Sequence, residues 1–135
     1  MTATFADFGL AAPLNRALEF AGFHTPTPIQ AQAIPHLIEG RDMLGLAQTG
    51  TGKTAAFVLP ILQALRSAGS KPEPHTTRAL ILAPTRELAI QIHESVTTLA
   101  KGQHFAHACV FGGVSINPQI DACLLYTSPS PRDRG

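Results

Sequence analysis

The sequence has few cysteines, almost no net charge and no long hydrophobic run, and each shortage excludes a class of protein. Cys109 and Cys123 lack the number and spacing of a disulfide scaffold or metal site, so we expect inert, reduced thiols. A formal net charge of +1 gives no electrostatic footprint for a polyanion. Residues 54–65 are too short and proline-interrupted to span a bilayer, and the N-terminus has no cationic segment before an apolar run. We therefore expect a cytoplasmic protein.

The remaining composition is typical of a globular domain. Hydrophobic residues make up 44% of the 135 residues and charged residues 14%, and the chain has no internal repeat. A complete domain of this length buries about two-thirds of the surface that its unfolded chain exposes. The sequence is therefore expected to form one domain at most.

Apolar spacing and end signals predict two helices in the first part of the chain. Pro13 can open a helix whose apolar residues lie three and four apart, and Gly22 suits its end. A second helix is expected after Thr27, where the Thr27 and Gln30 side chains can form a capping box. Gly40 is expected to end this second helix.

The following elements alternate between strand and helix. The helix expected from Lys53 is apolar on several sides, which indicates burial, and Pro60 is expected to bend or break it. Continuous apolar segments at 79–83 and 108–111 predict strands, separated by a helix that begins at Arg86. Together with an apolar strand before the third helix, the order is βαβαβ. This order predicts an α/β fold with a parallel sheet flanked by helices.

A glycine-rich loop joins the first predicted strand to the third helix. Gly50 and Gly52 allow positive-φ backbone whose N–H groups turn toward an anion, and the helix dipole adds positive charge. Lys53 is placed to reach the β- and γ-phosphates of a nucleotide, and Thr54 to offer its hydroxyl to Mg²⁺. The alternative is a tight turn, since the usual phosphate-loop pattern begins with Gly. The whole loop is Ala47, Gln48, Thr49, Gly50, Thr51, Gly52, Lys53 and Thr54.

Two residues in the N-terminal part are candidates for recognising the base. The Gln30 amide presents an acceptor beside a donor, which complements N6–H and N7 of adenine and could select ATP over GTP. Its competing role is the helix cap, which uses the same amide atoms. Phe5 could stack on the base, or it could bury itself as a core anchor for the N-terminal arm.

Two further short segments are candidates for contacts with a ligand. Thr85 and Arg86 follow a predicted strand where a helix begins, and this is the edge of an α/β sheet that binds ligands. Arg86 has a plain alternative, an ion pair with a nearby glutamate. Gly112 and Gly113 could allow close approach of a backbone, or form a simple turn.

A metal site is not expected near the end of the chain. His104, His107 and Cys109 lie close together in sequence, but the two histidines flank Phe105 and the cysteine falls in a predicted strand. The spacing of a four-ligand site is absent.

Four separated blocks, taken together, resemble the N-terminal, RecA-like half of DEAD-box ATP-dependent RNA helicases in order and spacing. The phosphate loop of this family begins with Ala, as it does at Ala47. The blocks are 22–30 with the preceding Phe5, 47–54, 84–89 and 112–113.

The resemblance implies a P-loop NTPase of RecA-like fold that uses ATP and Mg²⁺ and binds RNA. It implies adenine recognition by Phe5 and Gln30 and phosphate binding by residues 47–54. It also implies catalytic roles for Lys53 and Thr54, with Thr54 contacting the nucleotide-bound Mg²⁺. The implied contacts with the RNA backbone fall on Pro84, Thr85, Arg86, Gly112 and Gly113.

The resemblance also divides the chain. Residues 1–31 correspond to an N-terminal arm with the adenine-recognition motif, and residues 32–122 to part of a RecA-like ATP-binding domain. Residues 123–135 leave the family pattern and are rich in Ser, Pro and Arg, so we expect them to be disordered or to come from a cloning junction or frameshift. A short natural tail is the alternative.

The sequence contains no Asp-Glu-Ala-Asp, so the carboxylates that hold Mg²⁺ and position the attacking water have no candidate. No second RecA-like domain is present either. We therefore expect a C-terminally truncated piece of an RNA helicase that does not hydrolyse ATP by itself. Two alternatives stay open: another P-loop NTPase, such as a nucleotide kinase or transporter ATPase, and a non-catalytic nucleotide-binding or inert fragment.

Overall fold

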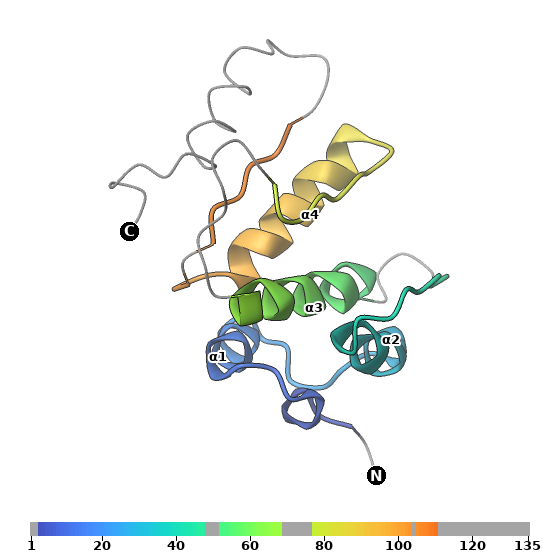
Figure 1. Cartoon of the computed structure of the whole chain (residues 1–135), viewed down its shortest axis with the longest axis vertical. Coiled ribbons are helices and arrows are strands. Elements are labelled where there is room, and N and C mark those ends of the chain that lie inside the picture. Colours follow the sequence, from blue (N-terminus) through green and yellow to red (C-terminus); the bar gives the residue numbers. More distant parts are fainter. Residues whose placement is uncertain (1–2, 48–51, 69–76, 104, 111–135) are drawn as a thin grey trace.

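The computed structural model describes residues 3–47, 52–68, 77–103 and 105–110. Figure 1 shows α3 across the middle of the molecule, with α1 and α2 on one side of it and α4 on the other. Helix α3 packs against α2 and α4, and α1 also contacts α4. The elements are a 3₁₀ helix η1 (Phe5–Phe8) and the α-helices α1 (Ala12–Phe20), α2 (Pro28–Ile38), α3 (Lys53–Ala68) and α4 (Arg86–Leu99).

The local end signals act as the sequence predicts. Pro13 lies in the first turn of α1, and Thr27 is the N-cap of α2 in a capping box with Gln30. Gly22 and Gly40 follow the ends of these helices with φ of +87° and +86°, a backbone region that glycine enters without strain. The predicted starts and ends of α1 and α2 are therefore confirmed.

Helix α3 contributes most to the hydrophobic core. Leu59 is fully buried, as are Leu14 of α1 and Ile34 of α2, so the core joins these three helices. Helix α3 is packed on two sides, by α2 and by α4. This packing also fixes Lys53 and Thr54, which form the first turn of α3. The buried cluster consists of Phe5, Leu10, Leu14, Leu18, Ile34, Ala55, Val58, Leu59, Leu62, Leu99 and Ala100.

Of the bend or break expected at Pro60, the break does not occur, because α3 continues through Pro60 as far as Ala68. Proline removes one backbone donor and normally costs a helix about 3 kcal/mol or more. Here Leu59 and Leu62 on either side are buried in the core, and tertiary packing of this kind supplies most of the stability of helices in proteins. Packing therefore overrides the local signal.

The apolar segments predicted as strands have no strand partners within the described ranges. Residues 41–47, 79–83 and 105–110 have neither helical nor ladder hydrogen bonding there. Leu44 and Leu82 are 87% and 83% exposed. A strand exists only through pairing with a neighbour, and an apolar run does not identify that neighbour. The parallel sheet thus remains a prediction.

None of the helices in the described ranges has the length and hydropathy that crossing a membrane requires.

Candidate nucleotide-binding site

The described part of the glycine-rich loop lies at the N-terminus of α3. Lys53 is the first residue of the helix and is exposed, and Thr54 behind it is half-buried. The carbonyl oxygen of Gly52 accepts from the Ala56 N–H at 3.2 Å, so Gly52 begins the helical hydrogen bonding. Ala47 is half-buried at the other end of the loop. The predicted phosphate contacts of Gln48, Thr49, Gly50 and Thr51 lie outside the described residues.

The Gln30 side chain connects α2 to this loop. Gln30 is fully buried; its Oε1 accepts from the Thr27 N–H at 2.9 Å, and its Nε2 donates to the Gly52 carbonyl oxygen at 3.2 Å. In return, the Thr27 Oγ1 accepts from the Gln30 N–H at 3.4 Å. The capping role is therefore confirmed. The same amide also fixes the carbonyl at which α3 starts.

Gly52 has neither the space nor the backbone conformation for a side chain. Its φ is +84°, a region that other residues rarely adopt. A Cβ at this position would lie 2.4 Å from Nε2 of Gln30 and 3.0 Å from Oγ1 of Thr27. The close approach of α2 to the loop therefore requires glycine.

Phe5, the other candidate for base recognition, lies in the core. Its ring is 5% exposed and meets the Phe8 ring edge to face, with the ring centroids 5.9 Å apart. Packing of this kind is the usual fate of a single aromatic residue near a terminus. The geometry favours a core anchor for the N-terminal arm.

The candidate phosphate contacts at the second site lie at the start of α4. Thr85 is the N-cap, and its Oγ1 accepts from the Leu88 N–H at 3.1 Å. Pro84, Thr85 and Arg86 are all exposed, and Arg86 takes part in a further contact within the chain. The predicted contacts of Gly112 and Gly113 lie outside the described residues.

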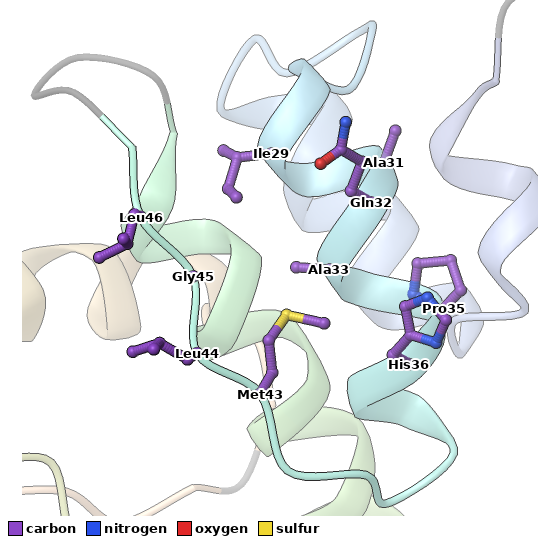
Figure 2. Close-up of a pocket in the computed structure, with 10 residues that line it drawn as sticks. All are labelled: Ile29, Ala31, Gln32, Ala33, Pro35, His36, Met43, Leu44, Gly45 and Leu46. Carbon is purple, nitrogen blue, oxygen red and sulfur yellow. The ribbon is translucent and has the colours of Figure 1, made fainter.

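A hollow of about 520 Å³ lies beside the site, between α2 and the segment that leads to the loop. Figure 2 shows α2 on one side of it and residues 43–46 on the other. Among the described residues, none that is predicted to bind a ligand lines the hollow, so the hollow is not assigned to the nucleotide. Its lining is Ile29, Ala31, Gln32, Ala33, Pro35, His36, Met43, Leu44, Gly45 and Leu46.

A pair of histidines that are distant in sequence joins α4 to residues 105–110. The rings of His93 and His107 meet at an angle of 62° with their centroids 4.9 Å apart. Burial, and then the neighbouring His93, lower the pKa of His107 below its ordinary value. Fourteen positions separate the two residues, so local sequence patterns give no signal of the pair. Within the described ranges, no group of three His, Cys, Asp or Glu side chains could hold a metal ion.

This pair predicts a loss of stability in mild acid. Because the folded pKa of His107 is lowered, the unfolded chain binds more protons than the folded chain as the pH falls through the unfolded pKa of about 6.5. Stability is therefore greatest above that pH and decreases below it. His107→Gln should lose less stability than the parent chain between about pH 7.5 and about pH 5.5, measured by urea unfolding. The exposed His24→Gln is the control, and an equal change in both variants would contradict this origin.

Comparisons with known proteins place these features in a family. Residues 27–130 match the DEAD/DEAH box helicase family. The chain is 49% identical over 120 residues to the ATP-dependent RNA helicase DeaD of Escherichia coli strain K12, covering 88% of this chain and 18% of that protein. It is also 48% identical over 116 residues to the ATP-dependent rRNA helicase RRP3 of Meyerozyma guilliermondii. That match covers 86% of this chain and 23% of RRP3.

Solved structures show the same relationship. A DEAD box protein from the hyperthermophile Methanococcus jannaschii superposes with a TM-score of 0.78 at 33% identity, covering 91% of this chain and 33% of that chain. The RNA helicase Prp28 from Chaetomium thermophilum bound to ADP superposes with a TM-score of 0.76 at 40% identity. The match covers 86% of this chain and 28% of the Prp28 chain. The present chain thus spans about a fifth of the length of the curated relatives described above. It belongs to the DEAD/DEAH box helicase family.

Proposed function

We propose that this chain supplies the ATP-binding part of an ATP-dependent RNA helicase, with the nucleotide phosphates at the N-terminus of α3. The observation that carries the proposal is the start of α3, where the positive-φ Gly52 precedes the exposed Lys53. The N-terminus of a 16-residue helix presents free N–H groups and partial positive charge, which together attract phosphate. The relatives named ATP-dependent RNA helicases, and the related structure bound to ADP, support the same interpretation.

Within this proposal, Lys53 and Thr54 have distinct roles. The Lys53 ammonium group would neutralise the β- and γ-phosphates as a point charge. The Thr54 hydroxyl would contribute an oxygen ligand to nucleotide-bound Mg²⁺, a cation that prefers oxygen donors. Ala47 and residues 48–51 would complete the loop around the phosphates, on a parallel sheet of RecA-like type.

Gln30 would act twice in this arrangement. Its amide already accepts from Thr27 and donates to Gly52, yet each amide oxygen has a second lone pair and each NH₂ a second hydrogen. Adenine would therefore pair with the remaining donor and acceptor after the buried side chain becomes accessible. Phe5, held in the core, would support the arm and leave base recognition to Gln30.

RNA would bind through its backbone near the start of α4. Thr85 caps this helix and Arg86 is its first residue, so a helix N-terminus and a guanidinium group lie at one place. Both favour a phosphate and neither reads a base, which suits contacts that position a strand without selecting its sequence. Pro84, Gly112 and Gly113 are the other proposed contacts.

ATP hydrolysis is not proposed for this stretch of sequence by itself. The chain has no Asp-Glu-Ala-Asp, so it offers no carboxylate pair for Mg²⁺ and for the attacking water. We propose that it binds nucleotide and that hydrolysis coupled to RNA unwinding belongs to the whole protein.

Nucleotide titrations of the purified chain test this proposal. A fluorescent ATP analogue with Mg²⁺ should bind the parent chain, and Lys53→Ala should weaken binding about tenfold, because one charge-assisted contact with phosphate is lost. Unlabelled ATP should displace the analogue more readily than GTP. Lys101→Ala, which removes an exposed lysine at the end of α4, is the control and should leave binding unchanged. Equal binding by Lys53→Ala and the parent would refute the phosphate site.

A further inference from the structure

A groove between α1 and the end of α4 is not part of the nucleotide site. It has a volume of about 250 Å³, and none of the candidate ATP or RNA contacts that the structure describes lines it. The lining residues of α1 follow each other at helical spacing and form one face of that helix. They are Pro13, Arg16, Ala17 and Phe20, opposite Thr98 and Lys101 from α4 and its end.

The groove combines an exposed aromatic ring with two positive charges. Phe20 is 78% exposed although it is a large apolar side chain. The Lys101 Nζ lies 4.4 Å from the centroid of its ring, at cation–π distance, so the ammonium group is held at the rim of the groove. Arg16 lies one helical turn before Phe20. Among the described residues, the lining contains no carboxylate, and neither Arg16 nor Lys101 forms an ion pair with a carboxylate.

We infer that this groove, which we call the α1–α4 groove, docks an acidic linear segment of a partner protein through one apolar side chain. The floor is apolar and small, below the roughly 300–1,000 Å³ typical of small-molecule sites, so it suits one anchoring side chain. The two cations match carboxylates on either side of that anchor. The small apolar floor with the two positive charges at its edge gives the groove the apolar centre and polar rim of a protein-binding surface.

The same features disfavour RNA as the occupant. Lys101 already covers one face of the Phe20 ring, which leaves a single face for stacking a base. A nucleic-acid backbone also needs a track of positive charges, whereas this groove has two. The acidic peptide is therefore the occupant whose chemistry fits best.

Binding of a synthetic peptide to the full chain tests the inference. The probe is a fluorescein-labelled peptide with one leucine between two pairs of glutamates, measured by fluorescence anisotropy at low salt. The parent chain should bind it, and Arg16→Glu combined with Lys101→Glu should weaken binding at least about tenfold. Phe20→Ala should weaken it about fivefold or more, because the anchor loses its main apolar contact. All three positions are at the surface, and equal melting temperatures establish that the variants fold like the parent.

Control peptides and a control variant complete the test. Replacement of the glutamates by lysines, or of the leucine by serine, should abolish measurable binding. Arg41→Glu, a charge reversal at an exposed arginine outside the groove, should retain it. Unchanged affinity in the double variant, or equal binding of the lysine peptide, overturns the inference. A labelled oligouridine that needs Arg16 and Lys101 while the acidic peptide does not bind would also overturn it and identify RNA as the occupant.

Discussion

Gly52→Ala should lower the free energy of unfolding by about 2–3 kcal/mol, more than alanine at any other positive-φ glycine described in the chain. A non-glycine residue at φ +84° costs on the order of 1 kcal/mol or more. In addition, the new Cβ would lie 2.4 Å from Nε2 of Gln30, so the amide must move and its bond to the Gly52 carbonyl oxygen is lost. A net hydrogen bond is worth about 1 kcal/mol. Urea unfolding followed by the helical circular dichroism signal measures the difference.

Gly40→Ala is the matched control for this prediction. Gly40 has almost the same φ, +86°, but a Cβ there would meet nothing within 4 Å. It therefore reports the backbone strain alone, and we expect a loss of about 1 kcal/mol. If Gly40→Ala and Gly52→Ala lower the free energy of unfolding equally, the contact between Gln30 and Gly52 does not contribute to stability.

Local signals in the sequence predict the local structure well. The Thr27–Gln30 cap depends on residues three positions apart, and Pro13 and Gly40 act within a single turn of their helices. Such features are decided by backbone chemistry that the sequence displays directly. The pattern that predicts a phosphate loop at residues 47–54 is also local, and the role of this loop stays a prediction.

Contacts between distant residues could not be predicted in this way. Gln30 and Gly52 are 22 positions apart, and their hydrogen bond depends on how α2 and α3 pack. Pro60 shows the same limit: the local rule predicts a bend or break, and burial of its neighbours keeps α3 continuous. The predicted strands show a related limit. The sequence shows that these segments are apolar, but it does not show which segment pairs with each of them.

The sequence left two roles for Gln30, and the structure connects the capping role to the start of α3, where the nucleotide site is proposed. The cap uses the amide oxygen, and the amide nitrogen reaches the carbonyl that begins α3. The capping residue is thus also the contact that sets the position of Gly52, immediately before Lys53. A ligand that draws the amide of Gln30 toward itself would therefore also change the hydrogen bonding at the start of α3.

Gln30→Glu should destabilise the chain by about 2–4 kcal/mol at neutral pH, the largest effect expected of a single change here. A carboxylate can still accept from the Thr27 N–H, but it has no donor for the Gly52 carbonyl oxygen and places a charge where the side chain is fully buried. Unpaired buried polar groups cost about 1–3 kcal/mol, and charged groups more. Gln32→Glu makes the same chemical change at an exposed position of the same helix and should cost less than about 0.5 kcal/mol.

The pH dependence of this variant tests the role of the donor separately. Burial and the facing carbonyl oxygen should raise the pKa of the introduced carboxyl group above its unfolded value of about 4.3. A group with a raised folded pKa contributes its stability below the unfolded pKa and loses it as the pH rises through the folded pKa. The difference between Gln30→Glu and Gln32→Glu should therefore shrink as the pH falls toward about 4, where the protonated carboxyl group can donate as the amide does. A difference that does not change with pH would mean that the cost comes from packing and that the donor to Gly52 is dispensable.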